Sequence, residues 1–430
     1  MEKQDIVIVG SGCAGLFAAL QFPASQKITM ITKEIIEHSD SFLAQGGICV
    51  LKTPEDYQSF FDDTLKAGHY ENRKESVDIM IRSSRETIHE LIGYGVDFAR
   101  DSDGTLLYTR EGAHSKPRIL YHEDETGKEI TSRLLAQVRK TRPNVQIVEN
   151  TAMVDLLVRE NRCFGVVIRQ ADGTYDAIPA DYTMLACGGI GGLYAHSTNY
   201  PQLTGDGLSV CMEHGVALEN INYVQIHPTT LYTKKPGRSF LISESVRGEG
   251  ALLYNAKMER FANELMPRDL LTAAIRKQMA EDGADFVWED LRPIGEEEIK
   301  SHFPNIYSRC LEEGYDVTKE CIPVTPAQHY FMGGIHVDEE SKTTMEHLYA
   351  IGETACNGVH GKNRLASNSL LESLVFAKRA ARHILEHYEP LSEPVPTVDY
   401  SAYEPAEALA QKRKERILAE IERLNQNGNQ

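Results

Sequence analysis

Two histidines and two arginines stand in segments that suit the binding of a small anion. They are His227 in QIHPTT, Arg268 in PRDLL, His329 in AQHYFMGG and Arg364 in GKNRLAS. A guanidinium group can bind a carboxylate through two hydrogen bonds, and an imidazole can donate one. If the fold brings the four together, they predict a clamp for a small dicarboxylate. Taken singly, each histidine is more typical of a structural hydrogen bond.

The segment around Arg364 also predicts the start of a helix. Residues 361–373 read GKNRLASNSLLES, so that a permanent cation precedes a run of hydroxyl and amide side chains. The free N–H groups at a helix start carry partial positive charge. An electron-rich ring against Ser369 and Leu370 would therefore be stabilised on becoming a reduced anion. An ordinary N-capped helix with a surface arginine explains this segment alone equally well.

A glycine-rich turn near the N-terminus predicts a dinucleotide site. The apolar strand pattern of residues 5–10 runs into GSGCAG, residues 10–15, which opens a helical pattern. In this context the glycines of G-x-G-x-x-G permit a tight turn, a close approach of the backbone to a pyrophosphate, and close packing of the helix. Lys33, at the end of the next strand pattern, occupies the expected contact point of the ribose.

Three further segments offer groups for a cofactor. The loop DSFLAQGG, residues 40–47, combines hydrogen-bonding side chains with a glycine pair, and Asp206 and Glu353 are carboxylates that can accept hydrogen bonds from hydroxyl groups. Each of these is as typical of an ordinary solvated turn. The three segments predict a cofactor site only if the fold brings them together.

The coarse pattern predicts an α/β fold built on a doubly wound, Rossmann-type sheet. Residues 5–32 read as strand, turn, helix and strand, and residues 54–98 read as helical. Residues 145–178 alternate like a small antiparallel insertion that ends in a hairpin, and buried strand patterns return at 182–192 and 347–353. Because the sheet pattern is interrupted and later resumes, we expect an inserted second domain.

The predicted second domain has a mixed α and β character. It contains helical stretches at 268–281 and 294–313, and a proline-rich linker and one charged amphipathic helix close the chain. The predicted division is residues 1–220 and 331–390 for the dinucleotide-binding domain, 221–330 for the insertion, and 391–430 for the linker and last helix.

Composition excludes several classes of partner. The net charge of −18 opposes long-range attraction to nucleic acid and to anionic membrane surfaces. The eight cysteines form no C-x-x-C pair or zinc-type spacing, so we expect reduced thiols and no metal site. No apolar run approaches the roughly 18 residues that span a bilayer, and no signal-peptide pattern is present. These features favour a cytoplasmic protein.

The motifs and their order resemble those of the flavoproteins of the succinate dehydrogenase, fumarate reductase and L-aspartate oxidase family. The similarity runs from about residue 5 to residue 388. The matching blocks are SGCAG, AQGGI, EGAHSKPRIL, ETGKEI, ACGGIGG, TGDG, QIHPTTLY, SESVRGEGA, PRDLL, PAQHYFMGGI, LYAIGE and GKNRLASNSLLES. The resemblance implies an FAD-binding domain with an inserted α+β capping domain that closes over the site. Longer members carry a C-terminal helical bundle, whereas a single predicted helix ends near residue 425 here. Two explanations are open: a shortened sequence or a natural short form.

Two features resemble the aspartate oxidase branch of that family. In REGAHS, residues 110–115, this branch carries a glutamate that can pair with a substrate ammonium, so Glu111 is the expected amine sensor. Asp40 falls where the membrane-bound relatives place a histidine covalently bonded to the flavin, and His38 is two positions out of register. The resemblance therefore implies FAD that is bound without a covalent link.

The resemblance also implies roles for individual residues. Arg268 matches the catalytic arginine of the family. The residues expected around the substrate are Glu111, Gln225, His227, Ser243, His329 and Arg364. Together with the glycine motif, the residues expected around FAD are Gly10, Ser11, Gly12, Cys13, Ala14, Gly15, Lys33, Asp40, Ser41, Phe42, Leu43, Ala44, Gln45, Gly46, Gly47, Asp206, Glu353, Ser369 and Leu370.

The implied activity is FAD-dependent oxidation of L-aspartate to iminoaspartate, the first step of the quinolinate route to NAD. The electron acceptor would be O₂, giving hydrogen peroxide, or fumarate. Quinolinate synthase is then a functional partner without an expected stable complex. Two alternatives remain open at this point: a soluble fumarate reductase or succinate dehydrogenase flavoprotein, and a non-catalytic FAD-binding scaffold.

Overall fold

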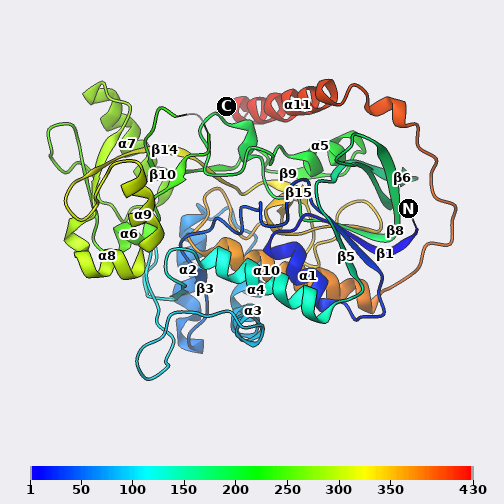
Figure 1. Ribbon diagram of the computed structural model, residues 1–430, viewed down its shortest axis with the longest axis horizontal. Coiled ribbons are helices and arrows are strands. Elements are labelled where there is room, and N and C mark those ends of the chain that lie inside the picture. Colours follow the sequence, from blue (N-terminus) through cyan, green and yellow to red (C-terminus); the bar gives the residue numbers. More distant parts are fainter. Residues whose placement is uncertain (1, 236, 428–430) are drawn as a thin grey trace.

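The computed structural model describes residues 2–235 and 237–427. Its largest element is a seven-stranded sheet (Figure 1). Strands β5-β2-β1-β8-β16 pair in parallel, and β8 also pairs with β7 and β7 with β6 in an antiparallel ribbon. Their bounds are β1 Gln4–Val9, β2 Ile28–Ile31, β5 Val145–Val148, β6 Ala152–Arg159, β7 Arg162–Arg169, β8 Tyr175–Leu185 and β16 Leu348–Ala350.

Both faces of this sheet are buried, as the continuous apolar run of β1 requires. Ile6 and Ile8 pack with Phe17 in one hydrophobic cluster, whereas Val7 and Val9 belong to another cluster. The first cluster lies among α1 Cys13–Gln21, α2 Tyr57–Ala67, α3 Lys74–Gly93, α4 Thr126–Thr141 and α10 Asn368–Glu386. The second includes side chains of α5 Asp206–Glu213 and α11 Ala406–Asn427.

Strand β8 differs from the sequence-based expectation of a hairpin ending near residue 178 and a separate strand from 182. One continuous strand of 11 residues, Tyr175–Leu185, is both the second strand of the hairpin and the expected buried strand. Its first half pairs with β7, and its second half lies between β1 and β16. Pro179 interrupts the alternation of the pattern, but it sits opposite Gly165 at the edge of the ribbon, where the strand continues through it.

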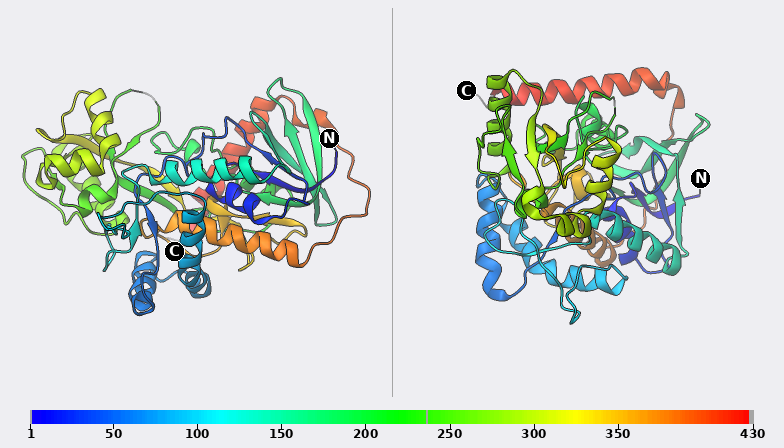
Figure 2. Two further views of the ribbon diagram at one scale, coloured as in Figure 1. Left: turned by 60° about the horizontal axis from the view of Figure 1, so that its bottom comes forward. Right: turned by 60° about the vertical axis from the view of Figure 1, so that its left-hand side comes forward.

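A second core unit, residues 224–331, forms one end of the molecule (Figures 1 and 2). Its five-stranded sheet has the order β11-β10-β14-β13-β12 and encloses its own apolar cluster. The strands are β10 Val224–Leu231, β11 Phe240–Leu241, β12 Leu252–Tyr254, β13 Val287–Asp290 and β14 Ile322–Phe331. The helices are α6 Glu244–Gly248, α7 Arg268–Asp282, α8 Glu296–His302 and α9 Pro304–Glu312.

The helical pattern at 294–313 folds as two helices, α8 and α9, and not as one. Pro304 begins α9 because it lacks the N–H that would continue α8 and its ring fits the first helical position. Two small sheets complete the fold. Their strands are β3 Ile48–Cys49 with β4 Ile119–Leu120, and β9 Leu218–Glu219 with β15 Gly334–His336 and β17 Ala355–Cys356. Among the described residues, no helix is long and apolar enough to cross a membrane.

Candidate active site

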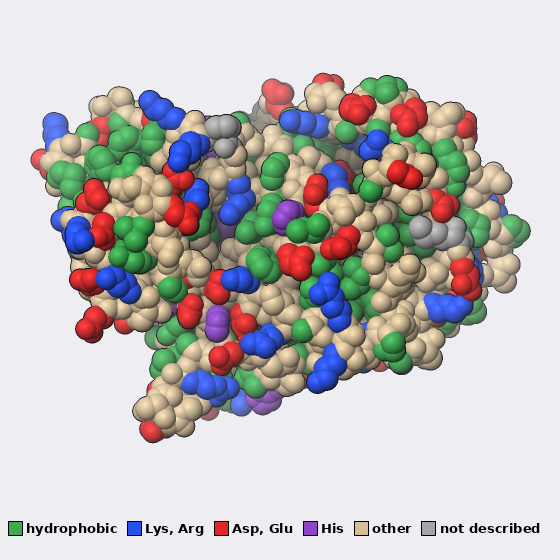
Figure 3. Space-filling model, in the orientation of Figure 1, with side chains coloured by type: hydrophobic (Ala, Val, Ile, Leu, Met, Phe, Trp, Pro, Cys, Tyr) green, Lys and Arg blue, Asp and Glu red, His purple; other side chains and the backbone are tan. Residues whose placement is uncertain are grey.

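A deep pocket lies along the carboxyl ends of the parallel strands and reaches the second core unit. It encloses about 1660 Å³ of space, part of it open to solvent. Its wall includes residues that directly follow β1, β2, β8 and β16, such as Gly10, Thr32, Ala186 and Ile351. This edge is where doubly wound sheets bind ligands. In Figure 3 the surface is hollowed between the second core unit and the rest of the molecule, and basic and histidine side chains lie along the hollow.

In the glycine turn, the backbone at Gly10 and Gly15 lies in close contact with other backbone atoms. Gly10 has φ +119°, and a Cβ placed on it would lie 2.0 Å from the carbonyl oxygen of Ala186. A Cβ on Gly15 would lie 2.2 Å from the carbonyl oxygen of Gly10. Helix α1 starts directly after this turn with no acidic residue in its first turn. Its N-terminus is therefore free of negative charge and suits a pyrophosphate.

Polar atoms without partners also point to a bound cofactor and substrate. Wall residues with a buried nitrogen or oxygen that has no hydrogen-bond partner among the described residues are Asp40 (Oδ2), Gln45 (Oε1), Asn199 (Oδ1), His227 (Nε2) and Arg364 (Nε). Buried polar atoms are rarely left unsatisfied. Together with the glycine turn, these atoms fit a large polar group such as FAD at one end and an anion at the other.

Two pairs of charged groups border the expected cofactor end. Lys33 Nζ lies 2.8 Å from Asp206 Oδ2, so the two residues that the sequence analysis names separately form an ion pair. Glu353 accepts a hydrogen bond from the backbone N–H of Phe331 at 3.0 Å. Burial and the charge of Asp40 raise the pKa of Glu353 well above its ordinary value, and burial raises the pKa of Asp40 to about 7. A carboxyl that stays protonated at neutral pH can donate a hydrogen bond to a cofactor.

The four residues of the expected anion clamp all lie in the wall of this pocket. His227 on β10 and His329 on β14 come from neighbouring antiparallel strands, and their ring centroids are 5.1 Å apart. Burial and the positive charge of Arg268 hold the pKa values of both histidines well below the ordinary value. Both imidazoles are therefore neutral. With Nδ1 of His227 accepting from the Thr229 N–H and Nδ1 of His329 accepting from the Thr198 hydroxyl, each ring keeps its one N–H at Nε2 to donate to an acid.

Arg364 is a buried cation without an acidic partner among the described residues. Its side chain is 4% exposed, its guanidinium lies 4.4 Å from the centre of the Tyr330 ring, and its Nη1 donates to Ser369 Oγ at 3.1 Å. Burial, and then the charge of Arg268, lower the pKa of Arg364 to about 10. A desolvated charge is costly unless an opposite charge meets it. The arrangement therefore favours an anionic ligand at this point.

Arg268 is held at the start of α7 by two partners. Its Nε donates to Glu244 Oε2 at 2.5 Å, and its Nη1 donates to Gln225 Oε1 at 2.8 Å. Burial alone would raise the pKa of Glu244, but Arg268 and Arg247 hold it below the ordinary value. Glu244 is thus an ionised partner that fixes the guanidinium at the cavity wall. Sequence reasoning missed Glu244, although its motif SESVRGEGA was recognised.

The expected amine sensor also lies in the wall, close to this arginine pair. Glu111 is 3% exposed, and its two carboxylate oxygens accept hydrogen bonds from Ser245 and Ser367. Burial and the nearby Glu244 raise the pKa of Glu111. Sequence reasoning named neither serine, because a serine at a helix start is ordinarily a cap.

Most of the expected site residues reach the pocket, but four lie outside its wall. Cys13 and Gly15 face the packed side of α1, where burial raises the pKa of the Cys13 thiol to about 11. Phe42 lines a separate cavity together with Leu16 and Arg139. Gln225 contacts Arg268 and the backbone oxygen of Arg364, so it positions the clamp from behind. The expected roles of these four stay predictions; in this structure they lie next to the wall and not in it. Wall residues that the sequence analysis did not name include Thr198, Asn199, Arg238, Glu244, Tyr330 and Ser367.

Comparison with known proteins agrees with this geometry. The family model described as FAD binding domain matches residues 5–370. The chain is 48% identical over 388 residues to an L-aspartate oxidase of Clostridium perfringens, covering 90% of this chain and 88% of that one. It is 40% identical over 422 residues to an L-aspartate oxidase of Pseudomonas aeruginosa, covering 93% and 78%. A solved E. coli quinol fumarate reductase chain superposes with a TM-score of 0.84 at 30% identity, covering 96% of this chain and 74% of that one. The protein described here therefore belongs to the L-aspartate oxidase family, within the flavoproteins that share this FAD-binding domain.

Proposed function

We propose that the protein is an FAD-dependent oxidoreductase that converts L-aspartate to iminoaspartate. The observation that carries the proposal is the meeting of two kinds of group at one end of the pocket. Unpaired Arg364, Arg268 and two neutral histidines suit two carboxylates, and the buried carboxylate of Glu111 suits an ammonium. L-Aspartate has these three charged groups.

FAD fits the other end of the pocket, and the turn at Gly10, the Lys33–Asp206 pair and the loop of residues 40–47 would hold it. When bound, it supplies an acceptor for two electrons. We propose non-covalent binding, because Asp40 stands where covalent relatives are expected to carry histidine. The nearby His38 ring instead stacks on Tyr200 at 5.1 Å.

The chain's own residues can perform the remaining chemistry. The substrate ammonium loses a proton, the Cα–H bond breaks with both electrons leaving as a hydride, and the nitrogen lone pair forms the C=N bond of iminoaspartate. We assign the proton transfer to Arg268. A lone guanidinium is a poor base at neutral pH. Because Arg268 shares its Nε–H with Glu244, a proton taken up on the cavity side can be matched by one passed to Glu244.

The electrons pass to O₂, which gives hydrogen peroxide, or to fumarate, which gives succinate. The same clamp would bind the fumarate. Iminoaspartate hydrolyses readily, so we propose that a quinolinate synthase consumes it without a lasting complex. We further propose residues 221–330 as a capping domain inserted between 1–220 and 331–390, with 391–430 as linker and last helix. This division is supported by four site residues that all come from the insertion: His227, Glu244, Arg268 and His329.

Replacing Glu111 by glutamine tests the assignment of the substrate. The amide keeps the size of the side chain but cannot pair with an ammonium, and a hydrogen bond to a charged group contributes about 1.5–3 kcal/mol. We expect kcat/KM for L-aspartate to fall roughly 10- to 150-fold, which is that range converted at about 1.4 kcal/mol per factor of ten. Fumarate reduction by the same variant should change little. Steady-state assays of both reactions give the comparison.

Glu123→Gln is the matched control, because this glutamate is exposed and lies outside the pocket. It should leave both activities at the wild-type level. Equal losses of aspartate oxidation and fumarate reduction in Glu111→Gln would instead favour a dicarboxylate enzyme.

A further inference from the structure

Serine hydroxyls from two separate parts of the fold hold both oxygens of the Glu111 carboxylate. Ser245 Oγ donates to Oε1 at 2.8 Å, and Ser367 Oγ donates to Oε2 at 2.6 Å. Ser245 belongs to α6 in the second core unit, whereas Ser367 is the residue before α10. All three side chains are buried. The carboxylate is therefore oriented from both sides of the pocket at once.

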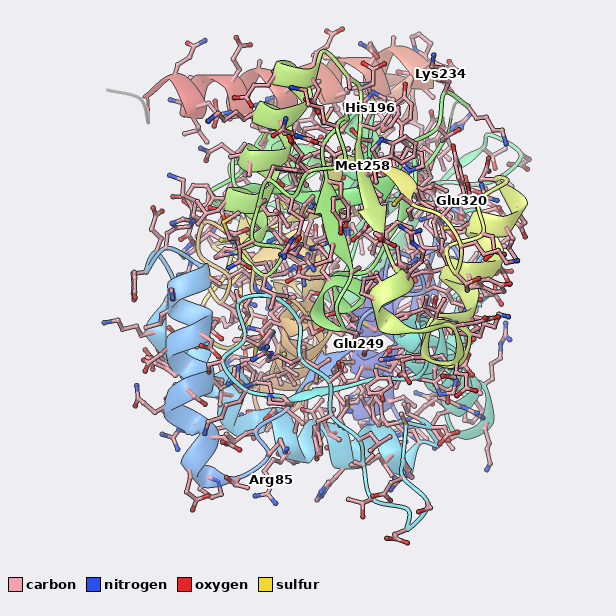
Figure 4. The ribbon with its side chains drawn as sticks, turned by 90° about the vertical axis from the view of Figure 1, so that its left-hand side faces the viewer. Arg85, His196, Lys234, Glu249, Met258 and Glu320 are labelled. Carbon is pink, nitrogen blue, oxygen red and sulfur yellow. The ribbon has the colours of Figure 1, made fainter. Side chains whose placement is uncertain are left out.

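The loop that carries Glu111 is fixed as well. The backbone N–H of Ala113 donates to the carbonyl oxygen of Leu265 at 3.3 Å, and Thr109 Oγ1 donates to Glu249 Oε1 at 3.4 Å. Figure 4 shows Glu249 at the border of the second core unit, next to this loop. A Cβ on Gly46 would lie 2.5 Å from Glu111 Oε1, so the carboxylate fills the space that faces it.

We propose that Ser245 and Ser367 are positioning residues that make Glu111 an ammonium receptor and so set the preference of the site for an amino acid over a plain dicarboxylate. This inference rests on the proposed function. A carboxylate oxygen can accept two hydrogen bonds. Each serine occupies one acceptor position on its oxygen, which leaves one position on each for the substrate ammonium.

The charge of Glu111 also depends on these hydroxyls. Burial and Glu244 favour its neutral form, whereas the two O–H donors and Arg268 favour its ionised form. Arg364 and the thiol of Cys49 also interact with it. A protonated Glu111 would no longer discriminate an ammonium from a neutral group. Each hydroxyl donates its proton to this acid, while Ser367 Oγ also accepts from the backbone N–H of Gly47 and Ser245 Oγ accepts from Ser243 Oγ. Their effect on selectivity is therefore the effect of the two donated protons on Glu111.

The test is to delete the hydroxyls and to follow the pH dependence of both reactions. We expect Ser245→Ala and Ser367→Ala to raise the pKa of Glu111, so that less of it is ionised on the acid side. The acid limb of kcat/KM for L-aspartate should then move to higher pH by about one unit for each hydroxyl, because each charge-assisted bond contributes at least about one pKa unit. The acid limb of fumarate reduction should stay in place, because fumarate has no ammonium.

Three controls separate positioning from folding. Ser245→Thr keeps the hydroxyl and should restore the wild-type limb. Ser367 has φ +60°, so Ser367→Gly deletes the hydroxyl without adding strain and should repeat the shift seen with alanine. Ser84→Ala removes another buried hydroxyl, which bonds the backbone of Ile81 and Leu51 outside the pocket, and should move neither limb.

Two results would overturn the proposal and leave the serines a structural role. One is an acid limb for L-aspartate that does not shift in either alanine variant, and the other is an equal shift for L-aspartate and fumarate. FAD content and melting temperature, measured on each variant, identify a folding defect. If the wild-type protein does not oxidise L-aspartate at all, the proposed function fails. Wild-type turnover with unshifted variants would contradict only the inference on the serines.

Discussion

Arg268→Lys should lower kcat for L-aspartate by about 10²- to 10⁴-fold, the range for loss of a positioned proton-transfer group. The guanidinium donates to Glu244 and to Gln225 through two different nitrogens, and a lysine ammonium cannot reproduce that geometry. The positive charge next to the buried Glu244 is kept, so the fold should survive. FAD content should equal that of the wild type. Stopped-flow measurement of anaerobic flavin reduction isolates the chemical step.

Arg276→Lys on the exposed side of the same helix is the matched control and should change neither kcat nor FAD content. A rate of flavin reduction in Arg268→Lys within a factor of three or so of the wild type would show that the guanidinium takes no part in proton transfer.

The second large effect is expected from Arg364→Leu. This variant should bind substrate much more weakly but keep the stability of the folded protein. Loss of a buried charge-assisted contact of about 1.5–3 kcal/mol weakens L-aspartate binding roughly 10- to 150-fold. The guanidinium has no acidic ion-pair partner in residues 2–235 and 237–427, and burial lowers its pKa to about 10, so the fold already opposes this charge. Replacing an unpaired buried charge by an apolar side chain should therefore leave the melting temperature of the substrate-free protein unchanged or higher.

The measurements are the dissociation constant for L-aspartate, from the concentration dependence of the rate of anaerobic flavin reduction, and the melting temperature without ligand. Arg382→Leu, an exposed arginine on α10, is the control and should bind L-aspartate normally. If Arg364→Leu binds L-aspartate as tightly as the wild type, the clamp is assigned to the wrong residues.

Local signals made part of this architecture predictable. The turn at Gly10 could be predicted because strand, glycines and helix follow one another within a few residues, so short-range sterics decide it. The insertion over residues 221–330 stays a prediction, based on a sheet pattern that stops and later resumes in the sequence. The split of the helical pattern at 294–313 follows from Pro304, whose missing N–H ends one helix and whose ring begins the next.

The meeting of His227 and His329 could not be derived from the sequence, because it depends on the antiparallel pairing of β10 with β14 across about a hundred residues. Only the resemblance to a family supplied that expectation. Glu244, Ser245 and Ser367 were missed for a different reason. Short polar residues at helix starts are ordinary caps, and only tertiary contacts show that these three meet Arg268 and Glu111.

Anaerobic addition of L-aspartate to the FAD-loaded protein tests the central claim most directly. If the clamp and Glu111 present this amino acid for oxidation, the visible absorbance of oxidised flavin should bleach with L-aspartate and persist with D-aspartate or succinate. A flavin that stays oxidised with L-aspartate would indicate a non-catalytic binding protein. Bleaching by succinate to the same extent would contradict the role of Glu111 in choosing the substrate.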